Sequence, residues 1–164
     1  MRVGKISLTG SHIKIAQEIL KSQKEVLTGT MIAIDPGSRS PGWSLWKLGR
    51  LVDSGVIKTK STHKISERLA TIHDFLESLP QADVALIEKI GQSRGNGKIQ
   101  SHRYLLWSIG AIAGALRCKN TIEIPQNMWF KFRGREYSKG DEADAILIGR
   151  TAIEVAKSQS NSSS

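Results

Sequence analysis

The stretch that decides the fold is MIAIDPGS, residues 31–38. Apolar side chains fill its first positions and Asp35 follows them, so we predict a buried strand over residues 31–35 that ends on a carboxylate. Pro36 and Gly37 then favour a turn. An acid directly after a buried strand is either an ordinary turn residue or a functional group, and the rest of the sequence bears on that choice.

Outward from this strand, short apolar runs alternate with helical patterns. Residues 43–47 and 52–58 are separated by a short turn and indicate two further strands of an antiparallel meander. The later segments alternate between helix and strand, which predicts the order βββαβαβα in a mixed α/β domain. These later elements are helices over residues 63–79, 101–117 and 141–157 and strands over residues 84–88 and 121–124.

The predicted elements divide the chain into three parts. Residues 31–157 form the α/β domain. Residues 1–30 are an N-terminal extension, and the apolar spacing over residues 11–27 predicts a helix that covers the domain surface or binds a partner. Serine-rich residues 158–164 favour a disordered tail.

Composition limits the class of protein. The chain has 164 residues, with 24 Lys and Arg against 15 Asp and Glu, giving a formal net charge of +9. This charge favours a polyanionic partner, although basic residues also serve solubility. The single cysteine, Cys118, excludes an internal disulfide and argues against a cysteine zinc cluster. No apolar run has transmembrane length and no signal peptide is visible, so we expect a cytoplasmic protein without a membrane partner, with organellar import left open.

Four acids stand at the ends of predicted elements. Asp35 and Glu88 end two different strands, and Asp141 and Asp144 lie on one face at the start of the last helix. Phosphodiester hydrolysis with two magnesium ions needs such a set, because carboxylates on rigid elements hold both ions close together. Taken singly, Asp35 can be a turn residue and the two helical aspartates can be caps. Taken together, the four favour a metal-dependent site.

These residues resemble the motifs of RuvC-type Holliday junction resolvases. Residues 32–39 (IAIDPGSR), followed by residues 41–44 (PGWS), are similar to the first-strand motif of that family. Residues 86–89 (LIEK) are similar to its second acidic strand, and residues 141–146 (DEADAI) are similar to the start of its C-terminal helix. The resemblance covers roughly residues 31–155.

The resemblance implies an RNase H-like nuclease domain over residues 31–157, with a mixed five-stranded sheet of three antiparallel and two parallel strands flanked by helices. It implies a crossover junction endonuclease of DNA recombination and repair that acts as a homodimer on four-way DNA junctions. The implied cofactor is Mg²⁺, two ions per site, with Mn²⁺ as a substitute and no organic cofactor. By position, Asp35, Glu88, Asp141 and Asp144 would be the catalytic residues and the metal ligands.

Two departures from the family pattern affect the expected substrate contacts. Only residues 125–140 lie between the fifth strand and the acidic helix, a shorter segment than typical members have. Residues 91–94 (GQSR) stand where many members place an aromatic side chain that wedges into the junction. Opening of a junction would therefore need another group.

Basic residues cluster on both sides of the predicted catalytic strands. We predict that these clusters contact DNA, since Lys and Arg neutralise phosphates, with a solvated loop as the alternative. Trp129 and Phe130 lie beside the second cluster and are interpreted as base-stacking or core residues. The predicted DNA contacts are Ser38, Arg39, Lys89, Gln92, Arg94, Lys98, Arg103, Lys131, Arg133, Arg135 and Lys139.

Other interpretations remain open at this point. An RNase H-like nuclease for RNA–DNA hybrids or structured RNA would use the same carboxylates, and a non-catalytic DNA-binding module could keep the fold. An actin-like or sugar-kinase ATPase also begins with D-x-G-[ST], but it needs a second such domain, for which this chain is too short.

The helix over residues 101–117 is apolar nearly all round and is the predicted homodimer interface, where Gly110 and Gly114 would allow close approach.

Overall fold

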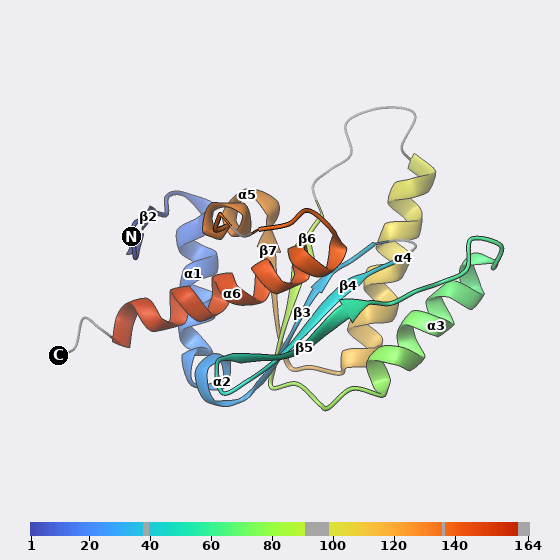
Figure 1. The fold of residues 1–164 in the computed structure, drawn as a ribbon, viewed down its shortest axis with the longest axis horizontal. Helices are drawn as coiled ribbons and strands as arrows, with labels where there is room; N and C mark the ends of the chain where they lie inside the picture. Colours follow the sequence, from blue (N-terminus) through green and yellow to red (C-terminus); the bar gives the residue numbers. More distant parts are fainter. Residues whose placement is uncertain (38–39, 91–98, 136, 161–164) are drawn as a thin grey trace.

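The centre of the molecule is a five-stranded mixed sheet, which confirms the predicted fold class (Figure 1). The computed structural model describes residues 1–37, 40–90, 99–135 and 137–160. The strands lie in the order β5-β4-β3-β6-β7; the pairs β3–β4 and β4–β5 are antiparallel, and β3–β6 and β6–β7 are parallel. The strands are β3 (Thr30–Asp35), β4 (Gly42–Lys47), β5 (Arg50–Val56), β6 (Val84–Lys89) and β7 (Asn120–Pro125).

Helices cover both faces of the sheet, so the central strands are buried on two sides (Figure 1). In β3, Met31 and Ala33 belong to the core on the side of α6. Ile32 and Ile34 belong to the core on the side of α3 and α4. Because side chains alternate between faces, this strand is apolar at consecutive positions until Asp35 ends it. The covering helices are α6 (Asp141–Ser160) on one face and α3 (Ile65–Glu77) and α4 (Ile99–Leu116) on the other.

The N-terminal segment packs against α6 and belongs to the first of these cores. It forms a hairpin and two helices, since Ser22 interrupts the single helix predicted over residues 11–27. Ala16, Ile19 and Val26 are fully buried in the core that also contains residues of α6. The Gln23 amide donates a 2.6 Å hydrogen bond to the carbonyl oxygen of Ala156. The elements are β1 (Arg2–Val3), β2 (Ile6–Ser7), α1 (Ser11–Lys21) and α2 (Gln23–Thr28).

Helix ends differ from the predicted ones for local reasons. α3 begins at Ile65, because the Glu67 carboxylate accepts a 2.8 Å hydrogen bond from the Lys64 backbone amide and closes the first turn. α6 continues to Ser160, so residues 158–160 are helical and the prediction of a tail from residue 158 was wrong there. Residues 161–164 lie outside the described residues. In the part of the chain that the structure describes, no helix combines the length and apolarity needed to cross a membrane.

Two short elements between β7 and α6 have no counterpart in the sequence prediction. They are α5 (Gln126–Trp129) and the 3-10 helix η1 (Phe130–Phe132). Both are shorter than the repeat that hydrophobic periodicity needs, so no pattern reveals them. They place the aromatic residues of this segment beside the end of β6 and the start of α6.

Candidate active site

Asp35 and Glu88 lie side by side at one end of the sheet. β3 and β6 are parallel neighbours in which Ile34 is opposite Ile87, so the next residue of each strand lies at the same edge. Their carboxyl groups share a hydrogen bond. The structure therefore brings together two of the four acids that the sequence singles out.

Burial and crowding of negative charge give this pair a high affinity for protons. Burial, followed by the hydrogen bond to Glu88 and its charge, raises the pKa of Asp35 from 3.8 to about 8. Burial also raises the pKa of Glu88, and the hydrogen bond from Asp35 partly offsets that effect. We infer that the pair holds one proton near neutral pH, with Asp35 as the donor and Glu88 as the acceptor.

Gly42 allows the start of α6 to lie against the sheet beside this pair. It is paired with Asp35 across β3 and β4. A Cβ atom at position 42 would lie 1.8 Å from the carbonyl oxygen of Asp141, so only glycine permits this approach. Because the start of α6 lies this close to the sheet, the charges of Asp141 and Asp144 both contribute to the raised pKa of Asp35.

The side chains of the first turn of α6 point in different directions. Glu142 faces β5, where its Oε1 accepts a 2.7 Å hydrogen bond from the Ser54 hydroxyl. Asp144 faces the other way and accepts a hydrogen bond from the Tyr137 hydroxyl at Oδ1. Glu142 is therefore separate from the carboxylate cluster of Asp35, Glu88, Asp141 and Asp144, as its angle around the helix predicts.

Two aromatic residues contact this cluster, and the sequence predicts neither contact. Burial, followed by the hydrogen bond to Asp144, raises the pKa of Tyr137 to about 12. Trp129 is 1% exposed, which makes it a core residue and leaves no face for base stacking. The indole N–H of Trp129 is close enough to Glu88 to lower the pKa of Glu88, although the geometry falls short of a full hydrogen bond. A four-residue helix and an irregular loop carry these two residues, and neither has a sequence signature.

The chemistry of the cluster fits a divalent cation. Its donors are carboxylate oxygens, the ligands that Mg²⁺ and Mn²⁺ prefer. Two half-buried carboxylates in contact are stabilised either by a shared proton or by a cation between them. As the described side chains stand, no three His, Cys, Asp or Glu form a group that could hold an ion. Asp35, Glu88, Asp141 and Asp144 are the residues whose carboxylate oxygens would hold such an ion.

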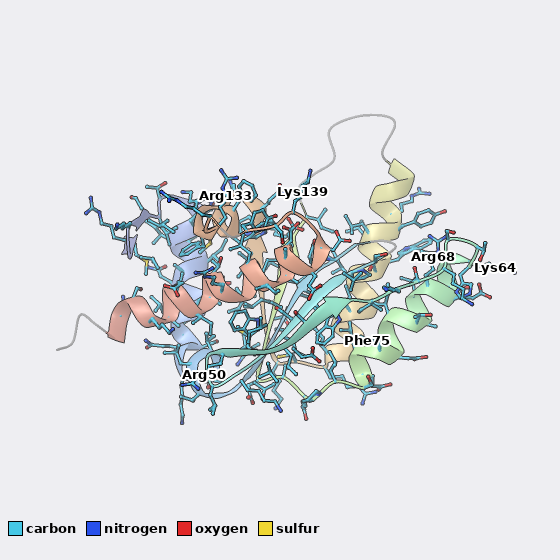
Figure 2. The ribbon with its side chains drawn as sticks, in the orientation of Figure 1. Arg50, Lys64, Arg68, Phe75, Arg133 and Lys139 are labelled. Atoms are coloured by element: carbon cyan, nitrogen blue, oxygen red, sulfur yellow. The ribbon has the colours of Figure 1, made fainter. Side chains whose placement is uncertain are left out.

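The predicted DNA contacts that the structure describes are all exposed. Lys139 lines an open groove of about 450 Å³ beside Asp141 and Glu142. Figure 2 shows Arg133 and Lys139 on the side of the molecule where α6 begins. The other exposed members are Lys89, Arg103, Lys131 and Arg135. The remaining predicted contacts, Ser38, Arg39, Gln92, Arg94 and Lys98, lie outside the described residues.

Comparison by sequence gives no match to a protein-family model or to a curated protein. Comparison of structures gives clear matches to solved structures. Thermus thermophilus RuvC in complex with a Holliday junction substrate has a TM-score of 0.65 at 19% identity, over 78% of this chain and 94% of that chain. A second structure of Thermus thermophilus RuvC has a TM-score of 0.61 at 18% identity, over 78% and 95%. The yeast mitochondrial Holliday junction resolvase has a TM-score of 0.53 at 11% identity, over 97% and 91%.

At this level of identity the likeness concerns the arrangement of the backbone. It covers more than three quarters of this chain and nearly the whole of each of the three related chains. The sheet order, the mixed strand directions and the helices on both faces agree with the fold expected from the sequence motifs. The chain therefore has the RNase H-like fold of the RuvC-type Holliday junction resolvases.

Proposed function

We propose that this protein is a metal-dependent endonuclease that resolves four-way DNA junctions. The observation that carries the proposal is the half-buried Asp35–Glu88 pair, with Asp141 and Asp144 beside it, on the fold that the RuvC resolvases share. One of those RuvC structures holds a Holliday junction substrate, which makes a four-way junction the first substrate to test.

Hydrolysis of a phosphodiester needs an activated water and a stabilised leaving oxygen, and two bound Mg²⁺ or Mn²⁺ ions supply both. Asp35 and Glu88 would hold the ions from the strand ends, and Asp141 and Asp144 from the start of α6. Metal ligands must be deprotonated, so Asp35 has to lose the proton that it shares with Glu88. We therefore expect metal affinity to rise with pH across the range in which Asp35 ionises.

The outer face of α4 supports the proposed homodimer. Ile112 is fully buried under this helix, whereas Leu106 and Trp107 on its outer side are 51% and 52% exposed. At Gly110 and Gly114, nothing lies within 4 Å of the place where a Cβ atom would be. A two-fold dimer through this face would present two equivalent sites to the two equivalent strands of a junction.

The exposed basic residues near the start of α6 would bind the DNA backbone. Arg133, Lys139 and Lys89 are exposed, and Lys139 shares a groove with Asp141. Each phosphate that a basic residue neutralises releases counterions, so we expect the affinity for DNA to fall steeply as salt is added.

The test is cleavage of a labelled four-way junction beside a linear duplex, a fork and an RNA–DNA hybrid of matched sequence, with Mg²⁺ present. We expect the junction to be cut fastest. Asp35→Asn and Glu88→Gln should abolish cleavage while junction binding stays equal or becomes tighter, because a metal ligand and a charge that repels phosphate are both lost. Glu123→Gln is the matched control, since Glu123 is an exposed acid on β7.

The outcomes separate the alternatives. Full cleavage in excess chelator, or by the Asp35→Asn protein, contradicts the metal mechanism. Equal rates on linear duplex and junction contradict junction selectivity but keep the nuclease. Preferred cleavage of the hybrid favours an RNase H-like role, and junction binding without cleavage of any substrate favours a non-catalytic DNA-binding module.

A further inference from the structure

The hydroxyl group of Tyr137 contacts an acid that the proposed metal site needs. It donates a hydrogen bond to Oδ1 of Asp144. A carboxylate has two oxygens with several acceptor positions, so this bond uses only part of the capacity of Asp144. The charge of Asp144 also acts on both Asp35 and Glu88, which places the carboxylate at the border between the tyrosine and the buried pair.

Tyr137 also makes a ring contact that is separate from its hydrogen bond to Asp144. The Phe130 ring meets the Tyr137 ring edge-on, with centroids 6.0 Å apart and planes at 84°. Trp129 packs against Phe130 with centroids 5.6 Å apart, and the guanidinium of Arg133 lies 4.2 Å from the centroid of the Phe130 ring. A phenol fixed by its own neighbours can orient a carboxylate, whereas a mobile one would simply follow it.

The segment that carries Trp129 and Phe130, formed by α5 and η1, is itself tied to the N-terminal elements. The His12 ring nitrogen Nε2 lies 2.9 Å from Oδ1 of Asn127 in α5. The Lys131 ammonium in η1 donates a 3.4 Å hydrogen bond to the carbonyl oxygen of Ser7. These contacts attach both ends of the short helical segment to a part of the chain that is buried against α6.

We propose that Tyr137 is a positioning residue that orients Asp144 for binding the divalent ion. The proposal rests on the metal-dependent function proposed above. A neutral hydroxyl restricts the rotation of the carboxylate without cancelling its charge, whereas a lysine or arginine at this place would compete with the ion. Hydrogen-bond partners that orient metal ligands in this way commonly contribute about 10–100-fold to metal affinity or activity.

The experiment measures the affinity of the DNA-free protein for Mn²⁺ by isothermal titration calorimetry, in four variants. Tyr137→Phe keeps the ring that packs on Phe130 and removes only the hydroxyl. We expect it to weaken Mn²⁺ binding about tenfold. Asp144→Asn should weaken binding further, and Tyr137→Phe should add nothing in the Asp144→Asn background, because two residues that act through one contact are not additive. The control is Thr71→Val, which removes a hydroxyl that donates to the Glu67 carbonyl oxygen on α3.

The double-mutant comparison distinguishes positioning from a structural role. If Tyr137→Phe binds Mn²⁺ within twofold of the wild type while Asp144→Asn is impaired, the inference about Tyr137 fails and the proposed function stands. If Tyr137→Phe weakens binding equally in both backgrounds, Tyr137 does not act through Asp144 and the inference also fails. If the wild type does not bind Mn²⁺, or Asp144→Asn has no effect, the proposed metal site fails together with the inference.

A second variant covers the case in which Tyr137→Phe does not fold. Phe130→Leu keeps the Tyr137 hydroxyl and removes the ring that holds it, at a position that is 36% exposed and so tolerant of change. We expect weaker Mn²⁺ binding here too, with recovery of cleavage at higher Mn²⁺ concentration. Unchanged affinity in Phe130→Leu would overturn the inference.

Discussion

Replacing Asp35 by asparagine should make the metal-free protein more stable at pH 8, although it should abolish catalysis. The wild-type side chain is a carboxyl group in a half-buried, negatively charged place, where partial burial and the neighbouring acids raise its pKa from 3.8 to about 8. Folding is therefore favoured while the group is protonated. This contribution is fully present below pH 4 and is lost progressively as the pH rises towards 8. An amide of the same shape never ionises and does not suffer this loss.

The magnitude follows from the difference in pKa. A difference of one corresponds to about 1.36 kcal/mol, so the rise from 3.8 to about 8 sets a ceiling on the order of 5 kcal/mol. Water partly reaches the side chain, because Asp35 has intermediate exposure. We therefore expect about half of this ceiling, roughly 2–3 kcal/mol in favour of Asp35→Asn at pH 8, and a difference near zero at pH 4. For a chain of this size, that corresponds to a rise of about 5–10 °C in Tm.

The assay is thermal denaturation of wild type and Asp35→Asn in chelator from pH 4 to pH 9, with Glu123→Gln as the exposed-acid control. Comparing variant with wild type at each pH cancels the titration of the groups that do not interact with Asp35. Added Mg²⁺ should then stabilise the wild type, by about 1.4 kcal/mol at ten times its Kd, and leave Asp35→Asn unchanged. A variant that is less stable than the wild type at pH 8, or one whose effect is the same at every pH, would refute the reasoning.

Three further predictions concern the surroundings of the site. Gly42→Ala should destabilise the protein by about 1–3 kcal/mol and weaken Mn²⁺ binding, because its Cβ would meet the Asp141 backbone at 1.8 Å; an unchanged melting curve would contradict this. Gly110→Ala has open space in the monomer, and alanine favours a helix by about 1 kcal/mol over glycine, so the monomer itself should not be destabilised. In the proposed dimer the added methyl group would prevent the close approach of the partner's helix, so we expect sedimentation to show a weakened dimer. A more stable protein with unchanged mass would argue against α4 as the interface. Arg133→Ala and Lys139→Ala should each reduce the slope of log Kd for junction binding against log salt by about 1, and a slope that does not change would remove that residue from the DNA contact.

The sequence singles out the four acids because each lies at the end or the start of an element with a strong pattern. Asp35 and Glu88 follow apolar runs, and the ends of neighbouring parallel strands meet at one edge. Tyr137 could not be predicted, because its contact with Asp144 depends on how an irregular loop folds back over the start of α6. Trp129 was open to two interpretations, and only its burial in the structure decides between them.

The five strands and the three long helices of the sheet domain follow from apolar periodicity, since both faces of the sheet are covered. The N-terminal helix shows the limit of that approach. An apolar stripe that includes Ala16 and Ile19 indicates that one face is buried, but it carries no information about what covers that face. The covering element is α6, more than a hundred residues away, and only the folded chain reveals it.

The pairing of Gln23 with Ala156 spans 133 positions and has a consequence for protein synthesis. α6, against which both α1 and α2 pack, is the last of these elements to be translated. At about 5–20 residues per second, a nascent chain needs roughly 7–27 s to pass from one partner to the other. During that interval Ala16, Ile19 and Val26 have no α6 to pack against. The pace of the ribosome, and the chaperones that attend it, therefore set how long this apolar surface is exposed to aggregation.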